Sequence, residues 1–590
     1  MTWEAWFTLA VLVSTIVALV RDVAAPAAVV LGAIVVLLLV EVVTVDEAFA
    51  GFSNPAPLTV GALYVLARAI EKTGALQPLI TAALGSGDGA RVGLARLLIP
   101  AACASAFLNN TPIVAMLAPQ VAAWASRRGQ PVSRFLMPLS FAAILGGTVT
   151  VLGTSTNIVV SGLLQADGQA PLGIFEISPV GLPVACVGLV ALLMLAPILL
   201  PDRRTASQQF EEDIREFAVS MNVAPGGPLH GRTVEQAGLR HLHGVFLVEV
   251  QREGEFIAPV SPDTTLHGGD RLMFVGRADL VADLQSTRGL VSTEQQHAAF
   301  VAGPNTSFFE AVVSEASPLA GKSLRESGFR ARYQAAVLAI HRAGARVRAK
   351  LGDVVLKPGD TLLLLADAGF RSRWRDRNDF LLVSRLDGAP PPTTPRQAAL
   401  VGAITVGIVL TAATGLFSIV QASLAGALAL VAFRVMTPAE ARSAVNIEVL
   451  VVIAAAFGLG AAVTTSGLAE VVAQLIVLTF DGWGTLGLLL AIAVTTVLFT
   501  EVITNNAAAV LMFPIAMATA SRVGEEPRLF AIVVAIAASL SFLSPLGYQT
   551  NTMVYGPGGY RFGDYARLGL PLSLLVLVVL VTTSAVFWAK

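Results

Sequence analysis

Ten stretches of the sequence are apolar for long enough to cross a lipid bilayer, and they constrain the fold more than any other feature. A chain inside hydrocarbon has to satisfy its backbone hydrogen bonds internally, so such stretches form helices. They cover residues 5–20, 24–42, 57–71, 134–163, 178–200, 397–412, 418–434, 447–466, 528–556 and 567–589. Only 13% of the residues are charged, and the mean hydropathy is +0.72. We therefore expect a polytopic α-helical membrane protein that has the lipid bilayer as a partner.

Two further apolar stretches, 91–126 and 483–521, carry polar residues at their centres. The first contains Asn109 and Asn110, and the second contains Thr504, Asn505 and Asn506. Amides are costly in hydrocarbon unless they have partners. We expect each stretch to be a re-entrant hairpin whose tip is buried in protein or faces water.

A charged segment separates the two apolar halves, 1–201 and 394–590. Residues 202–393 carry 23 basic and 23 acidic residues and all 6 histidines. Short alternating strands and a repeat at an offset of 90 residues predict two small α+β domains, 202–298 and 299–393. The repeat pairs Pro228, Leu229, Gly231, Arg232, Gly269, Asp270 and Leu272 with Pro318, Leu319, Gly321, Lys322, Gly359, Asp360 and Leu362.

The basic residues of the membrane halves predict the orientation. The segments 43–56, 164–177, 413–417 and 467–482 contain no Lys or Arg, which is typical of external loops. This predicts an inner-membrane protein with residues 202–393 in the cytoplasm and both termini outside. Five crossings per half is an odd number, so any repeat between the halves is inverted.

The two membrane halves do repeat in sequence. Asn109 and Asn110 match Asn505 and Asn506 at an offset of 396, and the segment 153–157 matches 547–551 at an offset of 394. Both marks occur in the same order inside apolar surroundings. They predict paired halves that share one site, each with a hairpin and a broken helix, the latter at 134–163 and 528–556.

The broken helices offer two kinds of ligand. Unwound carbonyls, amide oxygens and hydroxyls suit a hard cation such as Na⁺, whereas helix N-termini and neutral donors suit an anion. No Lys or Arg lies within these clusters, so a bound anion would need co-bound cations for charge balance. Glu501 is the one carboxylate nearby, and it is a Na⁺ ligand, a proton carrier or a structural acceptor.

Four segments carry a resemblance to a known family: FLNNTPIVAMLAP, GGTVTVLGTSTN, TEVITNNAAAVLMFP and SPLGYQTNTMVYGPGGYRFGD. They resemble the divalent anion/Na⁺ symporters, which include the sodium–sulfate and sodium–dicarboxylate carriers of the ion-transporter superfamily. The resemblance implies two Na⁺ sites, each formed by a hairpin tip and an unwound loop, with the dianion between them. It also implies a homodimer and elevator-type movement.

The family carries Ser, Asn, Thr at each hairpin tip, and neither tip here keeps all three. Which residue here replaces which residue of the family motif is therefore open by one position. Carried onto this sequence, the expected anion ligands are Asn110, Thr111, Thr156, Asn157, Asn506, Thr550 and Asn551. The expected Na⁺ ligands are Asn109, Asn110, Gly153, Thr154, Thr504, Asn505 and Gly547.

The expected function is Na⁺-coupled symport of a small dianion, with sulfate favoured over dicarboxylates. Two alternatives stay open: an ion/H⁺ antiporter or oxyanion exporter of the same superfamily, and an ion channel gated by the charged insert. The insert resembles tandem C-terminal subdomains of potassium-channel regulators, the TrkA-C type, which implies regulation by a small molecule or a dimer contact. We expect no enzymatic activity, no organic cofactor and no nucleic-acid partner, because the membrane halves lack His and the net charge is −1.

Overall fold

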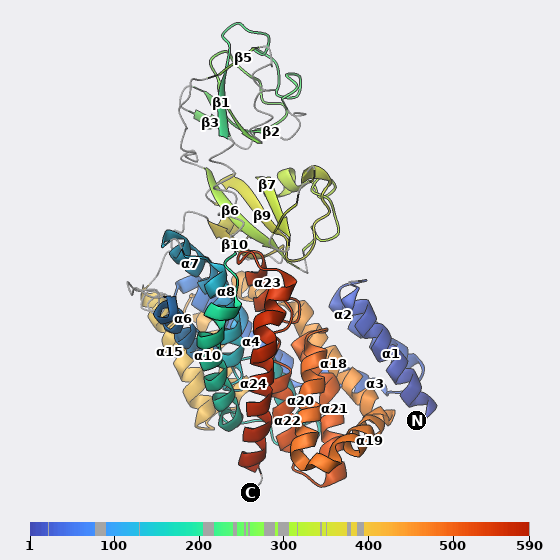
Figure 1. Ribbon diagram of the computed structural model, residues 1–590. Helices are drawn as coiled ribbons and strands as arrows, with labels where there is room; N and C mark the ends of the chain where they lie inside the picture. The colour runs from blue at the N-terminus through green and yellow to red at the C-terminus, as the bar shows by residue number, and fades with distance from the viewer. Residues whose placement is uncertain are drawn as a thin grey trace.

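The computed structural model shows a helical body with two small β-sheets stacked at one end (Figure 1). It describes residues 1–588 except 22, 77–89, 129, 204–217, 240–244, 253–254, 258–259, 277–288, 293–305, 315–316, 343–344, 348, 350, 368, 375–378 and 386–394. The expected domain boundaries at 298/299 and 393 lie outside the described residues.

The described residues of the first membrane half form a series of helices. They are α1 (Trp3–Val20), α2 (Pro26–Leu39), α3 (Val45–Ser53), α4 (Pro55–Thr73), α6 (Ala90–Ser105), α7 (Asn110–Arg127), α8 (Ser133–Gly147), α9 (Ser155–Ala166) and α10 (Ser178–Leu199).

The second half follows the same plan. Its helices are α15 (Pro395–Ala413), α16 (Ile419–Ala432), α17 (Pro438–Ala444), α18 (Ile447–Thr465), α19 (Leu468–Phe480), α20 (Gly484–Thr500), α21 (Asn505–Val523), α22 (Pro527–Ala537), α23 (Gln549–Tyr555) and α24 (Phe562–Trp588). Among the described residues, five helices are long and apolar enough to cross a membrane, namely α10, α15, α18, α21 and α24. The protein is a multi-pass membrane protein.

Two expectations about the connections are wrong. Residues 43–56 and 467–482 were expected to form external loops because they carry no basic residue, yet they contain helices α3 and α19. Helix α3 packs against α18, and the apolar helix α19 packs against α21. Absence of Lys and Arg therefore marks both loops and helices, and only the structure separates the two.

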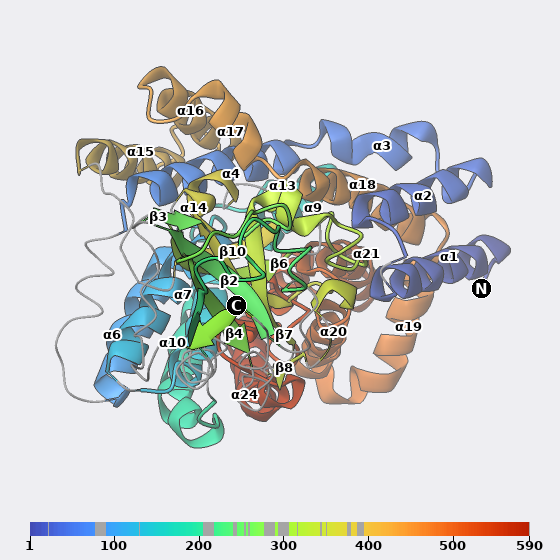
Figure 2. The same ribbon diagram turned by 90° about the horizontal axis from the view of Figure 1, so that it is seen from above.

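The outer helices of each half pack on a helix of the other half. Helices α2 and α3 contact α18, and α15 and α16 contact α4 (Figure 2). Glycines allow the α3–α18 crossing: a Cβ at Gly51 would lie 2.0 Å from the Ala454 carbonyl oxygen, and one at Gly458 would lie 2.4 Å from that of Ala48. The two halves therefore form one body whose outer helices are exchanged.

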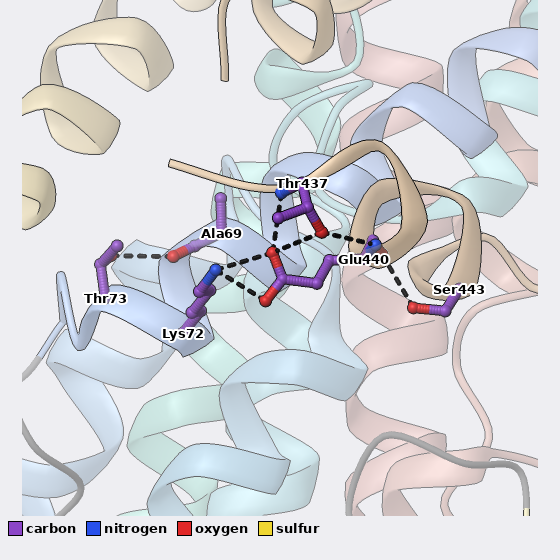
Figure 3. Close-up of polar contacts among 6 residues, drawn as sticks. All are labelled: Ala69, Lys72, Thr73, Thr437, Glu440 and Ser443. Carbon is purple, nitrogen blue, oxygen red and sulfur yellow. Dashed lines mark hydrogen bonds and ion pairs between the residues drawn. The ribbon is translucent and has the colours of Figure 1, made fainter. Parts of the chain in front are cut away.

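An ion pair joins α4 of the first half to α17 of the second (Figure 3). Lys72 Nζ lies 2.7 Å from both carboxylate oxygens of Glu440. Glu440 is also part of the capping box that starts α17, because it accepts a hydrogen bond from the Thr437 backbone N–H. Burial alone would raise the pKa of Glu440, but the hydrogen bonds from Lys72 and Thr437 outweigh it and hold that pKa below its ordinary value.

The charged insert forms two antiparallel sheets with the same strand order. The first contains β1 (Ala218–Val223), β2 (Val245–Arg252), β3 (Glu255–Ile257), β4 (Arg271–Gly276) and β5 (Leu290–Ser292), in the order β3-β2-β4-β1-β5. The second contains β6 (Thr306–Val313), β7 (Ala335–Arg342), β8 (Ala345–Arg346), β9 (Thr361–Asp367) and β10 (Phe380–Arg385), in the order β10-β6-β9-β7-β8.

A matching ion pair closes each sheet. Arg252 binds both oxygens of Asp270 at 2.7 and 2.8 Å, and Arg342 binds both oxygens of Asp360 at 2.7 Å. These pairs are 90 residues apart, and each arginine also donates to a backbone carbonyl of the loop before the aspartate. The carboxylate thus orders the turn that leads into β4 or β9.

Glu310 on β6 gives the insert a pH dependence. Burial raises the pKa of its carboxyl to about 7, so the folded insert binds a proton more strongly than the unfolded chain does. Its stabilising effect is complete at low pH and is lost as the pH rises through about 7, at a cost of about 3 kcal/mol. Glu310→Gln should abolish this loss. Hydrogen exchange of β6 and β9 at pH 5.5 and 8, corrected for intrinsic rates, measures this loss of stability. Glu255→Gln, at an exposed position, is the control and should keep the pH dependence. An unchanged pH dependence in Glu310→Gln would contradict the assignment.

Candidate functional site

Two helix pairs bring the polar hairpin tips into the centre of the body. Helices α6 and α7 flank residues 106–109, and α20 and α21 flank residues 501–504. Asn109 caps the start of α7, and Thr504 caps the start of α21, where its hydroxyl accepts from the Ala507 N–H at 3.4 Å. The helix starts therefore pair Asn109 with Thr504, an offset of 395.

This register differs from the match at 396 that the sequence favours. It pairs Asn110 with Asn505 and Thr111 with Asn506. Side-chain contacts agree, since Thr111 Oγ1 lies 3.4 Å from Gln549 Oε1 and Ser155 Oγ donates to Asn506 Oδ1 at 3.1 Å. With the hairpins offset by 395 residues, Thr111 corresponds to Asn506. With the broken helices offset by 394, Ser155 corresponds to Gln549, so the two contacts are equivalent.

Each broken helix is interrupted up to the second residue of its repeated segment, and residues 155–157 and 549–551 already form the starts of the next helices. Residues 148–154 separate α8 from α9, and residues 538–548 separate α22 from α23. Thr154 caps α9 and Tyr548 caps α23, both with extended backbone, and they are 394 residues apart. Helix α23 has only 7 residues, so about two helical turns separate its polar N-terminal end from its C-terminal end.

One asparagine pins each unwound segment by the same pair of hydrogen bonds. Asn157 Nδ2 donates to the carbonyls of Gly147 at 3.2 Å and Thr150 at 3.0 Å. Asn551 Nδ2 donates to the carbonyls of Ser541 at 3.0 Å and Ser544 at 3.2 Å. Both amide hydrogens of each asparagine are therefore used on the backbone, and neither is available to an anion in this structure.

The glycines of the two unwound segments are required by close backbone contacts. A Cβ at Gly153 would lie 2.5 Å from the Gly147 carbonyl oxygen, and one at Gly547 would lie 2.7 Å from that of Thr500. Each glycine thereby lets the loop touch its own hairpin, since Gly153 also approaches the Ser105 carbonyl oxygen.

Tyr548 links the two halves at the centre of the site. Its hydroxyl shares a hydrogen bond of 3.1 Å with Thr154 Oγ1, its counterpart in the other half. It also donates to the Asn110 side chain at 2.7 Å, in the amide orientation that gives every group a partner. In that orientation the Asn110 amide donates to Ser105 Oγ at 2.5 Å and to the Gly153 carbonyl at 3.2 Å.

The predicted site residues fall into two groups by burial. Asn109, Thr111, Thr504 and Asn505 are partly or fully exposed at the helix starts, whereas the remaining residues are buried: Asn110, Gly153, Thr154, Thr156, Asn157, Asn506, Gly547, Thr550 and Asn551. Thr156 Oγ1 and Asn157 Oδ1 are buried and have no hydrogen-bond partner in the described structure. Their counterparts Thr550 and Asn551 accept from Ser140 Oγ at 2.8 and 2.7 Å.

Glu501 supports the unwound segment of the second half. Its Oε1 accepts from the backbone N–H groups of Phe542 at 2.7 Å and Leu543 at 2.8 Å. Its Oε2 is buried and has no partner among the described residues. One oxygen therefore has the structural role, and the second is open to a cation or a proton.

Two ion pairs tie the halves together at opposite ends of this unit. Arg203, just after the first half ends, binds Asp564 of the second half at 2.9 Å, and Arg528 of the second half binds Glu176 of the first at 2.9 Å. Each acid also accepts from the backbone N–H three residues before it, at 2.8 Å. These contacts fasten α10, α22 and α24 into one unit around the site.

The residues that the sequence left unassigned are Ser105, Ser140, Ser155, Ser541, Tyr548 and Gln549. Ser155, Tyr548 and Gln549 lie within the repeated segments, where Tyr548 corresponds to the assigned Thr154, and Ser155 and Gln549 correspond to each other. That correspondence was the available signal. Nothing local marks Ser105 or Ser140, because each acquires its role through a partner from another helix.

The chain matches the family model described as "Citrate transporter" (CitMHS) over residues 11–535. It is 35% identical over 563 residues to the putative sulfur deprivation response regulator of Chlamydomonas reinhardtii, covering 94% of this chain and 96% of that protein. It is 36% identical to an uncharacterized transporter of Synechocystis, covering 92% of this chain and 90% of that one. Sodium/sulfate cotransporter 1 of Chlamydomonas reinhardtii is 26% identical, covering 91% of this chain and 84% of that protein.

Among solved structures, the YdaH transporter of Alcanivorax borkumensis covers 92% of this chain and 86% of its own, with a TM-score of 0.41 and 14% identity. The tandem TrkA-C assignment of the insert stays a prediction. The family match spans most of both membrane halves and both hairpin tips, and it ends before residues 547–551. This protein belongs to the citrate transporter (CitMHS) family of membrane transporters.

Proposed function

We propose that this protein is a Na⁺-coupled symporter of a small dianion, with sulfate favoured over dicarboxylates. The observation that carries the proposal is the convergence of helix N-termini around Thr154 and Tyr548. Helices α7, α9 and α21 have 18, 12 and 19 residues, and their starts are joined through Asn110, Ser155 and Asn506. Helix N-termini attract anions through free N–H groups and the helix dipole.

The charge balance supports cation coupling. None of the site residues is Lys or Arg, so dipoles and neutral donors alone would face a doubly charged anion. The unwound segments offer carbonyl and hydroxyl oxygens, which Na⁺ prefers. We assign Na⁺ binding to the two tips with Asn109, Asn110, Gly153, Thr154, Thr504, Asn505 and Gly547, and anion contact to Thr111, Thr156, Asn506 and Thr550. Relatives named as sodium/sulfate cotransporters support this choice.

The proposed mechanism is alternating access by an elevator-type movement of inverted repeats. The moving unit would contain α6–α10 and α20–α24, which the Arg203–Asp564 and Arg528–Glu176 pairs fasten together. The frame would contain α1–α4 and α15–α18, with the Lys72–Glu440 pair at its end. The same proposal includes a homodimer formed through the frame. It also places the insert in the cytoplasm and both termini outside.

Uptake into proteoliposomes tests this function. We expect uptake of radiolabelled sulfate with Na⁺ outside, at least tenfold less with K⁺, and weak competition by succinate and citrate. Equal uptake in K⁺ would contradict Na⁺ coupling. Stronger competition by citrate than by unlabelled sulfate would move the substrate to the carboxylates.

A second candidate is exchange of ions against protons, and Glu501 favours it. Its unpaired buried Oε2 is a group that could carry a proton. Glu501→Gln keeps both backbone hydrogen bonds to Oε1 possible. It should leave Na⁺-driven uptake within threefold of wild type if Glu501 is structural, and should abolish pH-driven exchange if it carries the proton.

A further inference from the structure

The second sheet of the insert is buried on both faces. One face packs in its own core through residues such as Phe309, Leu362 and Leu364. Residues on the other face are outside that core, yet they are 0 to 2% exposed: Val312, Thr361, Leu363 and Leu365. The register pairs Val312 with Thr361, so these residues form one continuous surface, which we call the outer face.

The first sheet differs at the equivalent positions. The residues 90 positions before Val312, Thr361 and Leu363 are Asn222, Arg271 and Met273, and they are partly exposed. The strand order is shared, so this difference does not arise from the fold of the sheet. It indicates that the outer face of the second sheet has a partner that the first sheet lacks.

The partner consists of the ends of α7 and α23. A Cβ at Gly556 would lie 1.7 Å from Thr361 Oγ1 and 3.1 Å from Thr361 Cβ. One at Gly359 would lie 3.7 Å from Thr552, and β10 packs against α7. Figure 1 shows β6, β9 and β10 directly above these helix ends. Thr361 Oγ1 is buried without a hydrogen bond in the described structure, so the contact depends on close packing.

Both helices begin at the site and end at this sheet. Helix α23 starts with Gln549, which contacts Thr111 of α7, and continues with Thr550, which Ser140 binds. Seven helical residues span about 10 Å, so α23 is a short rod between the anion site and the insert. A displacement at Gly556 therefore moves Thr550.

We propose that the second sheet positions the anion site by holding the ends of α7 and α23 through its outer face. Thr361 and Gly556 are positioning residues, since they act on the site through α23 and touch no substrate. The inference rests on the proposed function and goes beyond it, because it makes the insert part of the binding geometry.

Single methyl groups test the contact. Gly556 has φ −67° and ψ −55°, so Gly556→Ala causes no backbone strain. Its methyl would overlap Thr361, whereas the Gly359 carbonyl oxygen at 3.6 Å is an ordinary van der Waals contact. We expect at least a tenfold rise in KM for sulfate with a smaller change in kcat. Thr361→Ala in the same protein should restore KM to within threefold, because it removes Oγ1. Gly563→Ala is the matched control, since a Cβ there meets nothing within 4 Å.

Thr361→Leu adds bulk from the insert side and should reproduce the rise in KM with α23 unchanged. Hydrogen exchange in β9 and in residues 549–555 should increase in Gly556→Ala and return in the double variant. This readout stands even if the wild type takes up no sulfate, which would refute only the proposed function. The inference is overturned if Gly556→Ala matches Gly563→Ala in exchange, or if Thr361→Ala fails to restore the exchange pattern.

Discussion

Asn110→Ala and Asn506→Ala should each lower sulfate uptake at least a hundredfold while the protein still folds. Asn110 joins its own hairpin to both unwound segments, through Ser105, Gly153 and Tyr548. Asn506 accepts from Ser155 across the halves at 3.1 Å. Each substitution removes a buried amide that positions helix N-termini, and small displacements of such groups weaken binding strongly. Uptake into proteoliposomes, normalised to the amount of monodisperse protein, measures the effect.

Asn446→Ala is the matched control. Asn446 caps α18 in the proposed frame, where its side chain accepts from the Val449 N–H at 3.3 Å. Losing a helix cap costs about 1 kcal/mol, so this variant should lose some thermal stability and keep its uptake. Uptake above one fifth of wild type in either Asn110→Ala or Asn506→Ala would remove that residue from the site.

Gly181→Ala and Gly569→Ala should each destabilise the protein by about 3 kcal/mol or more. A Cβ at Gly181 would lie 2.0 Å from the Thr148 carbonyl oxygen, and one at Gly569 would lie 2.0 Å from that of Phe542. The two contacts are equivalent, because each places the last helix of a half against its unwound segment. Overpacking typically costs 1–3 kcal/mol, and backbone atoms move less readily than side chains.

The midpoint of thermal unfolding in detergent, followed by size-exclusion chromatography, measures this effect. Gly407→Ala on α15 is the control, since a Cβ there meets nothing within 4 Å. It should leave the midpoint unchanged or slightly raised, because Ala favours helix more than Gly does. A midpoint for Gly181→Ala equal to that of Gly407→Ala would show that the last helix is not held against the unwound segment.

The positions of the tips and breaks could be predicted because their cause is local. Amides inside apolar runs, and glycines beside threonines, are incompatible with continuous lipid-facing helix whatever surrounds them. The breaks at 148–154 and 538–548 therefore follow from residues within the same segments. The register of the two hairpins could not be predicted, because Asn-Asn repeats at 396 whereas the helix starts repeat at 395.

The roles of individual residues could be predicted less well. The sequence predicts Asn157 and Asn551 as anion ligands. In the structure their amide hydrogens donate to backbone carbonyls. Tyr548 went unassigned although it stands 394 residues after Thr154, because its role depends on reaching across to that residue. The two insert sheets share a sequence pattern, and the contacts with α7 and α23 show what covers the outer face of the second.

The sequence by itself determined that this chain is a membrane protein of two repeated halves, where its helices break, and that a charged segment lies between the halves. Those properties depend on hydrophobicity, charge and backbone preferences, which act over a few turns of chain. Only the tertiary structure decided the hairpin register, the exchange of outer helices and the meeting of Asn110, Thr154 and Tyr548. These features depend on contacts between residues about 400 positions apart, and the strength of such contacts is set by packing that no local pattern encodes.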